Sequence, residues 1–135
     1  MTRNVLFSFV GETPQVVTET LYFLLKKWDI IDGVVHLLTT SEDEKEKKIK
    51  TNSLDLVKEN GWIARFNDAY KTSWKPCDDS VFVWEQKGVQ ILPFDDIYKE
   101  SDNDKAIDVV TRIIYYWTII QKDVRLFVSL AGGRK

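Results

Sequence analysis

Apolar positions along the chain form short continuous runs separated by helical stripes. Residues 4–10 are rich in aromatic and β-branched side chains and stop at Gly11, which is typical of a strand buried on both faces of a parallel sheet. A helix is predicted next, because Thr13 is a good N-cap and Pro14 is favoured at the first helical position. The apolar side chains that follow at i, i+4, i+7 and i+11 are Val17, Leu21, Leu24 and Trp28. Residues 4–28 therefore predict a β-α unit.

Strands and helices continue to alternate after this unit. Apolar runs predict further strands at 33–38, 89–93 and 124–130. Ser41 and Glu44 form a capping-box pattern for a second helix, and the mixed charges of 42–50 indicate a solvated helix face. A third helix is predicted to begin after a cap at Ser101 or Asp102. Its apolar stripe is Ala106, Val110, Ile113 and Trp117.

The alternation predicts one α/β domain over residues 1–135, with a doubly wound, mostly parallel, Rossmann-like sheet. A chain of 135 residues is long enough to bury one sizeable core. Residues 60–88 are less regular: they are rich in aromatic side chains and are interrupted by the polar stretch 75–79. We interpret this part as an aromatic-rich insertion or lid, formed by a helix followed by a hairpin.

Composition excludes several classes of protein. The chain has 44% hydrophobic and 30% charged residues, and no apolar run approaches the roughly 20 residues of a membrane helix. The N-terminus lacks the features of a signal peptide, and Cys77, as the single cysteine, cannot form an intrachain disulfide. We therefore expect a cytoplasmic protein with no membrane partner. A net charge of −2 argues against DNA or general nucleic-acid binding, but it does not exclude a small anionic ligand.

The single histidine lies inside a predicted strand. His36 is therefore expected to be a packed imidazole with hydrogen-bond partners rather than a ligand or a base. One histidine and one cysteine far apart in sequence offer no zinc site. The patterns of the P-loop and of the dinucleotide-binding turn are also absent. No metal and no cofactor are therefore expected.

Ligands of open α/β sheets bind beyond the carboxyl ends of the strands, where the strand order reverses. This rule selects three segments, 11–13, 39–41 and 131–135. The first places the hydroxyl of Thr13 at a helix N-terminus, where amides and the helix dipole favour an anion. The last has two glycines that let a phosphate approach the backbone, followed by two cations. Thr13 acting only as a cap, the glycines acting only as a turn and the cations forming only a solvated terminus remain alternatives.

Three stretches resemble one family in matching order. Residues 11–21 (GETPQVVTETL) resemble the first-loop motif of the CRISPR-associated Rossmann-fold (CARF) proteins of type III systems. Asp96-Ile97, followed by Asp102-Asn103, resembles the segment before the last sensor-domain helix of that family. Residues 129–135 (SLAGGRK) resemble its closing signature, with Leu130 in place of isoleucine. Because members usually continue with a helix after this lysine, we expect the chain to be truncated at its C-terminus.

The resemblance implies a homodimer that binds a cyclic oligoadenylate, a tetra- or hexa-adenylate, in a cleft across its two-fold axis. For some members it also implies metal-independent ring-nuclease activity, in which the 2′-hydroxyl of the ligand is the nucleophile. The motifs assign catalytic roles to Thr13 and Lys135. The expected ligand-binding residues are Gly11, Glu12, Gln15, Thr40, Ser41, Ala131, Gly132, Gly133 and Arg134.

Two other functions remain open. The domain is a non-catalytic sensor that controls a missing C-terminal effector, or it is an unrelated α/β module that binds a nucleotide or phosphate. Cleavage of the ring without metal would separate an enzyme from a sensor. Comparison of ring binding with AMP binding would identify an unrelated module.

Overall fold

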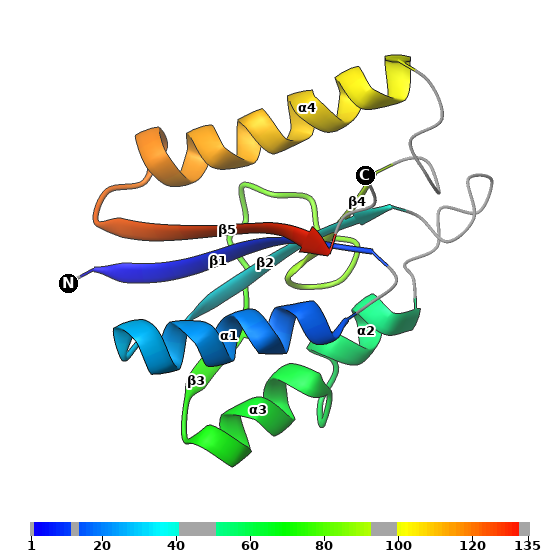
Figure 1. Cartoon of the computed structure of the whole chain (residues 1–135). Helices are drawn as coiled ribbons and strands as arrows, with labels where there is room; N and C mark the ends of the chain where they lie inside the picture. The colour runs from blue at the N-terminus through cyan, green and yellow to red at the C-terminus, as the bar shows by residue number, and fades with distance from the viewer. Residues whose placement is uncertain (1, 12–13, 41–50, 93–99, 133–135) are drawn as a thin grey trace.

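A computed structural model describes residues 2–11, 14–40, 51–92 and 100–132 (Figure 1). Its elements are β1 (Arg3–Val10), α1 (Gln15–Trp28), β2 (Asp32–Thr40), α2 (Thr51–Val57), α3 (Trp62–Tyr70), β3 (Ser73–Pro76), β4 (Val89–Leu92), α4 (Glu100–Tyr115), the π-helical turn η1 (Tyr116–Ile120) and β5 (Val124–Gly132). The capping box predicted at Ser41 and Glu44 and the charged run 42–50 lie outside the described residues.

The strands form one sheet in which every strand-to-strand pairing is parallel. β1 lies between β2 and β5, and the other side of β2 pairs with β3 along its first half and with β4 along its second half. The chain thus builds the sheet outward from β1 to β2, β3 and β4, then crosses back to place β5 on the opposite side of β1. The predicted α/β class with a mostly parallel, Rossmann-like sheet is confirmed.

Helices cover both faces of this sheet (Figure 1). One buried cluster joins the sheet to α1, α2 and α3, with Leu6, Leu21, Leu56 and Phe66 among its members. The other joins the opposite face to α4 and η1, with Phe7, Leu38, Ile113 and Trp117 among its members. Consecutive side chains of β1 enter different clusters because they alternate across a strand, so both faces of β1 are buried.

The first helical stripe is correct at three positions and wrong at its last. Val17, Leu21 and Leu24 are buried, whereas Trp28 is 57% exposed. The reason is that α1 ends at Trp28 and Asp29 adopts a left-handed conformation, which turns the chain so that Ile30 enters the core instead. At the other end of α1, Pro14 is the N-cap residue and Gln15 begins the helix. The predicted cap at Thr13 and the predicted first helical position at Pro14 are therefore each one residue too early.

Several boundaries also differ from the prediction. β2 extends through Thr40 and β5 through Gly132, so these residues end strands instead of opening loops. α4 begins at Glu100, which places Ser101 and Asp102 inside its first turn and not at its cap. The two strands are longer than predicted because Thr39 and Thr40 of β2 pair with β1 and β4, and Gly132 of β5 pairs with β1, which the local pattern does not reveal. The stripe of the last helix is correct: Ala106, Ile113 and Trp117 are buried, and Val110 packs against them.

Residues 60–88 contain α3, β3 and a connecting segment. The helix is present, but the strand after it pairs parallel with β2 and does not form an arm of a hairpin. The antiparallel contact of this segment is a single bridge between Gln86 and Val89. Parallel pairing suits this strand because α3 serves as its crossover. The aromatic side chains are divided between the two cores: Phe66 and Trp74 belong to the α1 side, whereas Phe82 and Trp84 pack on the α4 side. In the described structure, these four side chains therefore contribute to the body of the domain.

Candidate functional site at the carboxyl edge of the sheet

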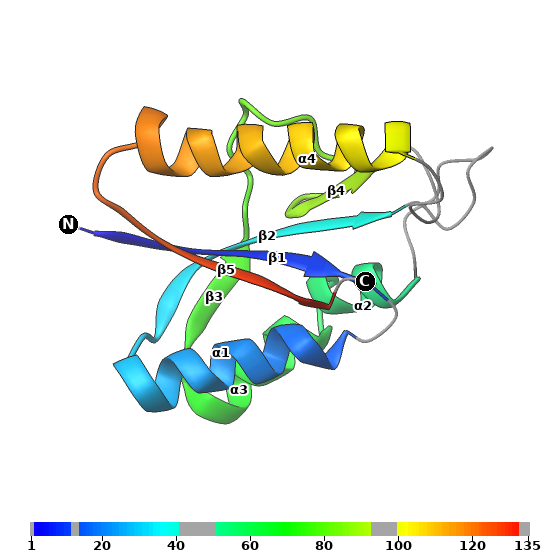
Figure 2. The same ribbon diagram turned by 45° about the horizontal axis from the view of Figure 1, so that its top comes forward.

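The carboxyl ends of the three longest strands lie at one level. Val10 of β1 is the register partner of Thr39 in β2 and of Gly132 in β5. In Figures 1 and 2 the arrowheads of these strands lie at the same edge, next to the beginning of α1. Strand order reverses between β1 and β5, which is the place where open α/β sheets bind ligands. This edge is the candidate site, and we call it the carboxyl edge.

A hydroxyl from β2 holds the end of β1. Thr39 and Val10 are both fully buried, and Thr39 Oγ1 donates a hydrogen bond of 2.7 Å to the backbone carbonyl of Val10. On the other side of β1 the ladder is irregular: Ser8 pairs with Ser129, but Val10 pairs with Gly132. β5 therefore carries one extra residue between these two pairs. Bulges of this kind bend a strand and often occur beside functional sites.

The predicted site residues divide into a described and an undescribed group. Gly11 follows β1 and is half-buried, and Gln15 lies exposed in the first turn of α1. Thr40 ends β2 with an exposed fraction of 6%. Ala131 and Gly132 are the last residues of β5. The remaining residues, Glu12, Thr13, Ser41, Gly133, Arg134 and Lys135, lie outside the described structure.

The structure thus brings together the chain segments that lead into the three predicted loops. The end of β1 continues to Gly11 and the end of β2 is Thr40, one residue beyond the pair Val10 and Thr39. Gly132 lies beside Val10 on the other side. The beginning of α1 adds first-turn amides, which in a helix generally lack intrahelical partners; here the Val17 amide donates to the Pro14 carbonyl at 3.1 Å. A site at this edge is therefore suited to an anion held by backbone amides.

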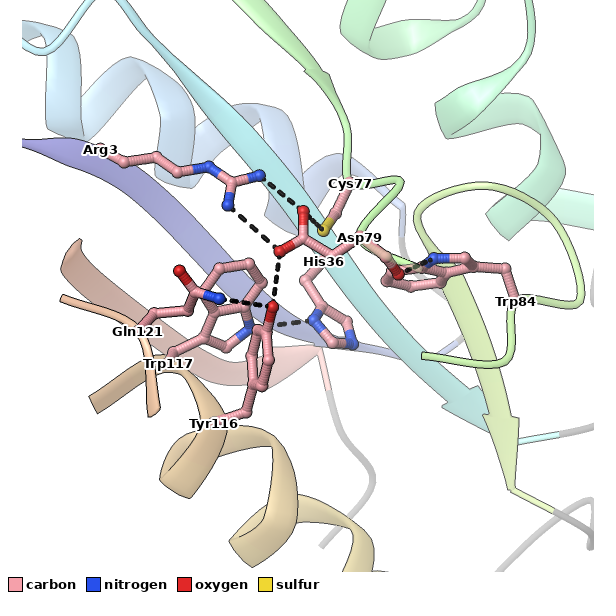
Figure 3. Close-up of polar contacts among 8 residues, drawn as sticks. All are labelled: Arg3, His36, Cys77, Asp79, Trp84, Tyr116, Trp117 and Gln121. Carbon is pink, nitrogen blue, oxygen red and sulfur yellow. Dashed lines mark hydrogen bonds and ion pairs between the residues drawn. The ribbon is translucent and has the colours of Figure 1, made fainter. Parts of the chain in front are cut away.

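A second polar cluster lies on the α4 face and was missed by sequence reasoning (Figure 3). The Arg3 guanidinium forms two hydrogen bonds with the Asp79 carboxylate, of 2.8 and 3.2 Å. Tyr116 donates its hydroxyl proton to the same carboxylate at 2.9 Å and accepts a hydrogen bond from Gln121 Nε2 at 2.7 Å. Arg3 and Asp79 are 76 residues apart, so no sequence spacing could have paired them.

These contacts keep Asp79 ionised. The hydrogen bonds from the Arg3 guanidinium lower the pKa of Asp79, while the same contact raises the pKa of Arg3. The Tyr116 pKa is raised, first by burial and then by its hydrogen bond to Asp79. Burial raises the pKa of the Cys77 thiol to about 12, and this leaves Cys77 a poor nucleophile, because the thiolate is the reactive form.

His36 is buried between two hydrogen-bond partners, as predicted. Its Nδ1 atom accepts a hydrogen bond of 3.1 Å from the indole nitrogen of Trp117, and its Nε2 atom contacts Gln90 Oε1. Because indole can only donate, Nδ1 is unprotonated and Nε2 carries the proton that is donated to Gln90. Burial lowers the pKa of His36 to about 4. The imidazole is thus neutral near pH 7 and links β2 to β4 and η1.

The α4-face cluster stabilises the fold and is separate from the carboxyl edge. Arg3 begins β1 at the opposite end from Gly11, and its guanidinium also lies 5.1 Å from the ring centre of Trp117. Within the described residues, no group of three or more His, Cys, Asp or Glu side chains could hold a metal ion. The described helices also include none that is long and apolar enough to span a membrane.

Comparison with known proteins gives one match. The model of the family described as CRISPR-associated protein NE0113 matches residues 13–135. No curated protein and no solved structure matches the chain. The family match includes the helix and strands that form the carboxyl edge, apart from β1.

Proposed function

The chain belongs to the family of CRISPR-associated proteins described as NE0113, and from this premise we propose that it binds a cyclic oligoadenylate and cleaves the ring. The binding site is the carboxyl edge of the sheet. The proposal goes beyond the family description and rests on the position of the two most specific motifs.

The observation that carries the proposal is the adjacency of β1 and β5. The motif that begins at Gly11 follows β1, and the motif that begins at Ser129 occupies the end of β5. Val10 and Gly132 are register partners, so segments about 120 residues apart in sequence leave the sheet side by side. The topological switch point of a parallel sheet lies between these strands. Both halves of the resemblance therefore supply the same ligand site.

The chemistry follows from the ligand. Each ribose of a 3′–5′ linked ring has a 2′-hydroxyl beside the scissile phosphate. In the proposed step the 2′-oxygen attacks phosphorus and loses its proton, and the bond from phosphorus to the 5′-oxygen breaks. The 5′-oxygen takes up a proton, and the product is a linear oligoadenylate with a 2′,3′-cyclic phosphate. The protein has to hold the 2′-oxygen in line and stabilise the charge that develops on phosphate.

The proposed roles follow the two motifs. Lys135 binds the phosphate oxygens, and backbone amides near Thr13 and Gly133 bind the same charge. Thr13 positions the reacting group through its hydroxyl. No side chain is assigned as the acid that protonates the leaving 5′-oxygen, so turnover is expected to be slow.

Cleavage of cyclic tetra- and hexa-adenylate by the purified protein in EDTA tests the proposal. Thr13→Ala is expected to lower the cleavage rate by about tenfold or more while changing affinity less, because positioning matters most in the transition state. Lys135→Ala should weaken both binding and cleavage, because the cation contacts phosphate throughout the reaction. Rates come from chromatography of the products, and affinities from calorimetry.

Thr2→Ala and Lys122→Ala are matched controls, since both side chains are exposed and lie away from the carboxyl edge. Both controls should cleave like the original chain. Ring binding without cleavage would identify a sensor instead of an enzyme. Binding of AMP as tight as that of either ring would refute ring recognition altogether.

The proposal also requires a two-fold dimer, because a ring of repeating adenylates offers equivalent phosphates about an axis. Two apolar surfaces could form its interface. One is on α4 and η1, where Ile107, Tyr115, Ile119 and Ile120 are 54–61% exposed; the other is on α1, where Tyr22, Phe23 and Trp28 are 42–57% exposed. We expect sedimentation to show a dimer, and either Tyr115→Lys or Phe23→Lys to convert it to a monomer. A chain that stays monomeric at high concentration with ring present would contradict ring binding across a dimer.

A further inference from the structure

We infer that the Thr40 hydroxyl binds a ribose 2′-hydroxyl of the ring on the α4 side of the carboxyl edge, while the phosphates lie on the α1 side. This inference rests on the proposed function and adds to it the orientation of the nucleotide across the end of the sheet. The residues that carry it are the last two of β2, Thr39 and Thr40, together with the helices that begin at this edge.

Thr39 and Thr40 point to opposite faces of the sheet, because side chains alternate along a strand. Leu37, two residues before Thr39, belongs to the buried cluster beneath α1. Leu38, two residues before Thr40, belongs to the cluster beneath α4, and so does Leu92, the register partner of Thr40 in β4. Thr39 therefore faces α1, and Thr40 faces α4.

The two hydroxyls differ in their hydrogen bonding. Thr39 Oγ1 donates to the Val10 carbonyl at 2.7 Å. No residue of the described structure forms a hydrogen bond with the Thr40 hydroxyl, although only 6% of Thr40 is exposed. Buried polar groups normally have a partner, so an exception calls for an explanation. Because Thr40 is the last residue of β2, a ligand at the carboxyl edge can supply that partner.

The neighbours of Thr40 in the sheet leave this direction open. Val10 and Thr39 are register partners, and the residues that follow them are Gly11 and Thr40. Glycine offers no side chain that could cover the threonine from the β1 side. On the β4 side Thr40 is paired with Leu92, which is fully buried and apolar. Neither neighbouring side chain can therefore accept or donate a hydrogen bond at Thr40.

The two helices that begin at the carboxyl edge, on opposite faces of the sheet, differ in charge (Figures 1 and 2). The first turn of α1 contains no acidic residue, so its amides and its dipole favour a phosphate. The sequence of α4 begins with Glu100, and Asp102 and Asp104 follow within the next four residues. Acidic residues oppose a phosphate on the α4 side but not a neutral hydroxyl. This difference favours phosphates beside α1 and the ribose beside Thr40.

A ribose hydroxyl also matches the threonine chemically. Both groups can donate and accept a hydrogen bond. In a 3′–5′ linked ring the 2′-hydroxyl is the free hydroxyl of each ribose. The contact is therefore one that a ring of 2′-deoxyadenylates cannot make.

A cycle of four affinities tests this contact. Calorimetry measures the binding of a cyclic oligoadenylate, and of the ring of the same size made from 2′-deoxyadenylate, to the original chain and to Thr40→Val. The original chain should bind the 2′-deoxy ring about fivefold or more weakly, as expected for the loss of one hydrogen bond. In Thr40→Val this preference for ribose should fall by about threefold or more, because the partner of the 2′-hydroxyl has been removed.

Thr39→Val is the matched control, since it makes the same change one residue away on the opposite face. It should keep the full preference for ribose. Urea denaturation adds a readout without ligand. Thr40→Val should unfold at the same urea concentration as the original chain or at a higher one, because valine replaces a buried hydroxyl that has no partner in the described structure. Thr39→Val should unfold at a lower concentration, because it loses the hydrogen bond to the Val10 carbonyl.

The failure of this inference can be distinguished from the failure of the proposed function. An unchanged preference for ribose in Thr40→Val, or its loss in Thr39→Val, would overturn the inference and leave ring binding in place. Unfolding of Thr40→Val at a lower urea concentration would also overturn it, because the hydroxyl would then have a partner within the chain. If the original chain binds no ring, the proposed function is refuted and the inference with it.

Discussion

Replacement of Trp117 by alanine should lower the free energy of unfolding by about 3–5 kcal/mol, the usual cost of removing a buried tryptophan side chain. Trp117 is 1% exposed and donates its indole proton to His36. Its ring centre lies 4.8 Å from that of Tyr116, and the Arg3 guanidinium lies above it. Alanine would leave a large cavity and would also deprive His36 Nδ1 of its donor.

Trp28→Ala is the matched control for this substitution. Trp28 was assigned to the core by the same i+11 spacing as Trp117, but its side chain is 57% exposed. Trp28→Ala should lower the free energy of unfolding by about 1 kcal/mol or less. Urea denaturation followed by far-UV circular dichroism measures both values. If Trp117→Ala proves unfolded without urea, Trp117→Phe provides the measurement, with a smaller expected loss. Equal destabilisation at positions 28 and 117 would contradict the burial described for these two residues.

The contrast between these tryptophans shows what periodicity can predict. The spacing of apolar residues identifies a helix face, and both stripes have the correct period. It does not show where that face leaves the core. At Trp28 the helix stops and a left-handed Asp29 redirects the chain, whereas at Trp117 a π-helical turn continues over the sheet. The difference depends on the neighbouring elements and is absent from the local pattern.

Strands were predictable to the extent that both of their faces are buried. β1 and the centre of β2 are continuous apolar runs, as expected for inner strands of a parallel sheet. β3 has only the four residues Ser73–Pro76, of mixed polarity, and its pairing with β2 gives no local signal. The last residues of β2 and β5 were predicted as loops because the apolar runs that indicate these strands end at residues 38 and 130.

The location of the candidate site was more predictable than its internal contacts. Once the alternation of strands and helices indicates a parallel sheet, the loops after its strands are expected at one edge, and the shared level of Val10, Thr39 and Gly132 agrees with this geometry. The hydrogen bond between Thr39 and Val10 could not be predicted, because it depends on strand register. The link between Arg3 and Asp79 likewise depends on the path of the segment after β3.

The protonation of His36 should make stability depend on pH in a defined window. Burial lowers the pKa of His36 from its ordinary value of 6.5 to about 4. Between these values the unfolded chain binds a proton at His36 that the folded chain does not bind. Stability from this residue is therefore complete above pH 6.5 and is lost as the pH falls towards 4. The full contribution of His36 to the free energy of unfolding is about 3 kcal/mol, of which about 2 kcal/mol should be lost between pH 7 and pH 5.

Among the described residues with a shifted pKa, His36 is the one whose folded and unfolded values bracket the range from pH 5 to pH 6. Asp79 affects stability only at lower pH. Because its pKa is lowered in the folded chain, the stability that it contributes is present above its ordinary pKa of 3.8 and is lost as the pH falls below that value. Arg3 and Tyr116 titrate far above the window. His36 is the only histidine of the chain, so its imidazole signals in proton NMR can be assigned without mutagenesis. They should show no titration near pH 6.5 in the folded protein.

His36→Gln should remove the loss of stability between pH 7 and pH 5, whatever its effect at pH 7. Glutamine can accept a hydrogen bond from Trp117 and donate one to Gln90, but it does not titrate. Urea denaturation of both proteins at pH 7, 6 and 5 gives the comparison. The original chain should lose about 2 kcal/mol over this range and His36→Gln less than about 0.5 kcal/mol. The same pH dependence in both proteins, or imidazole signals that titrate near pH 6.5, would show that His36 is not held neutral between Trp117 and Gln90.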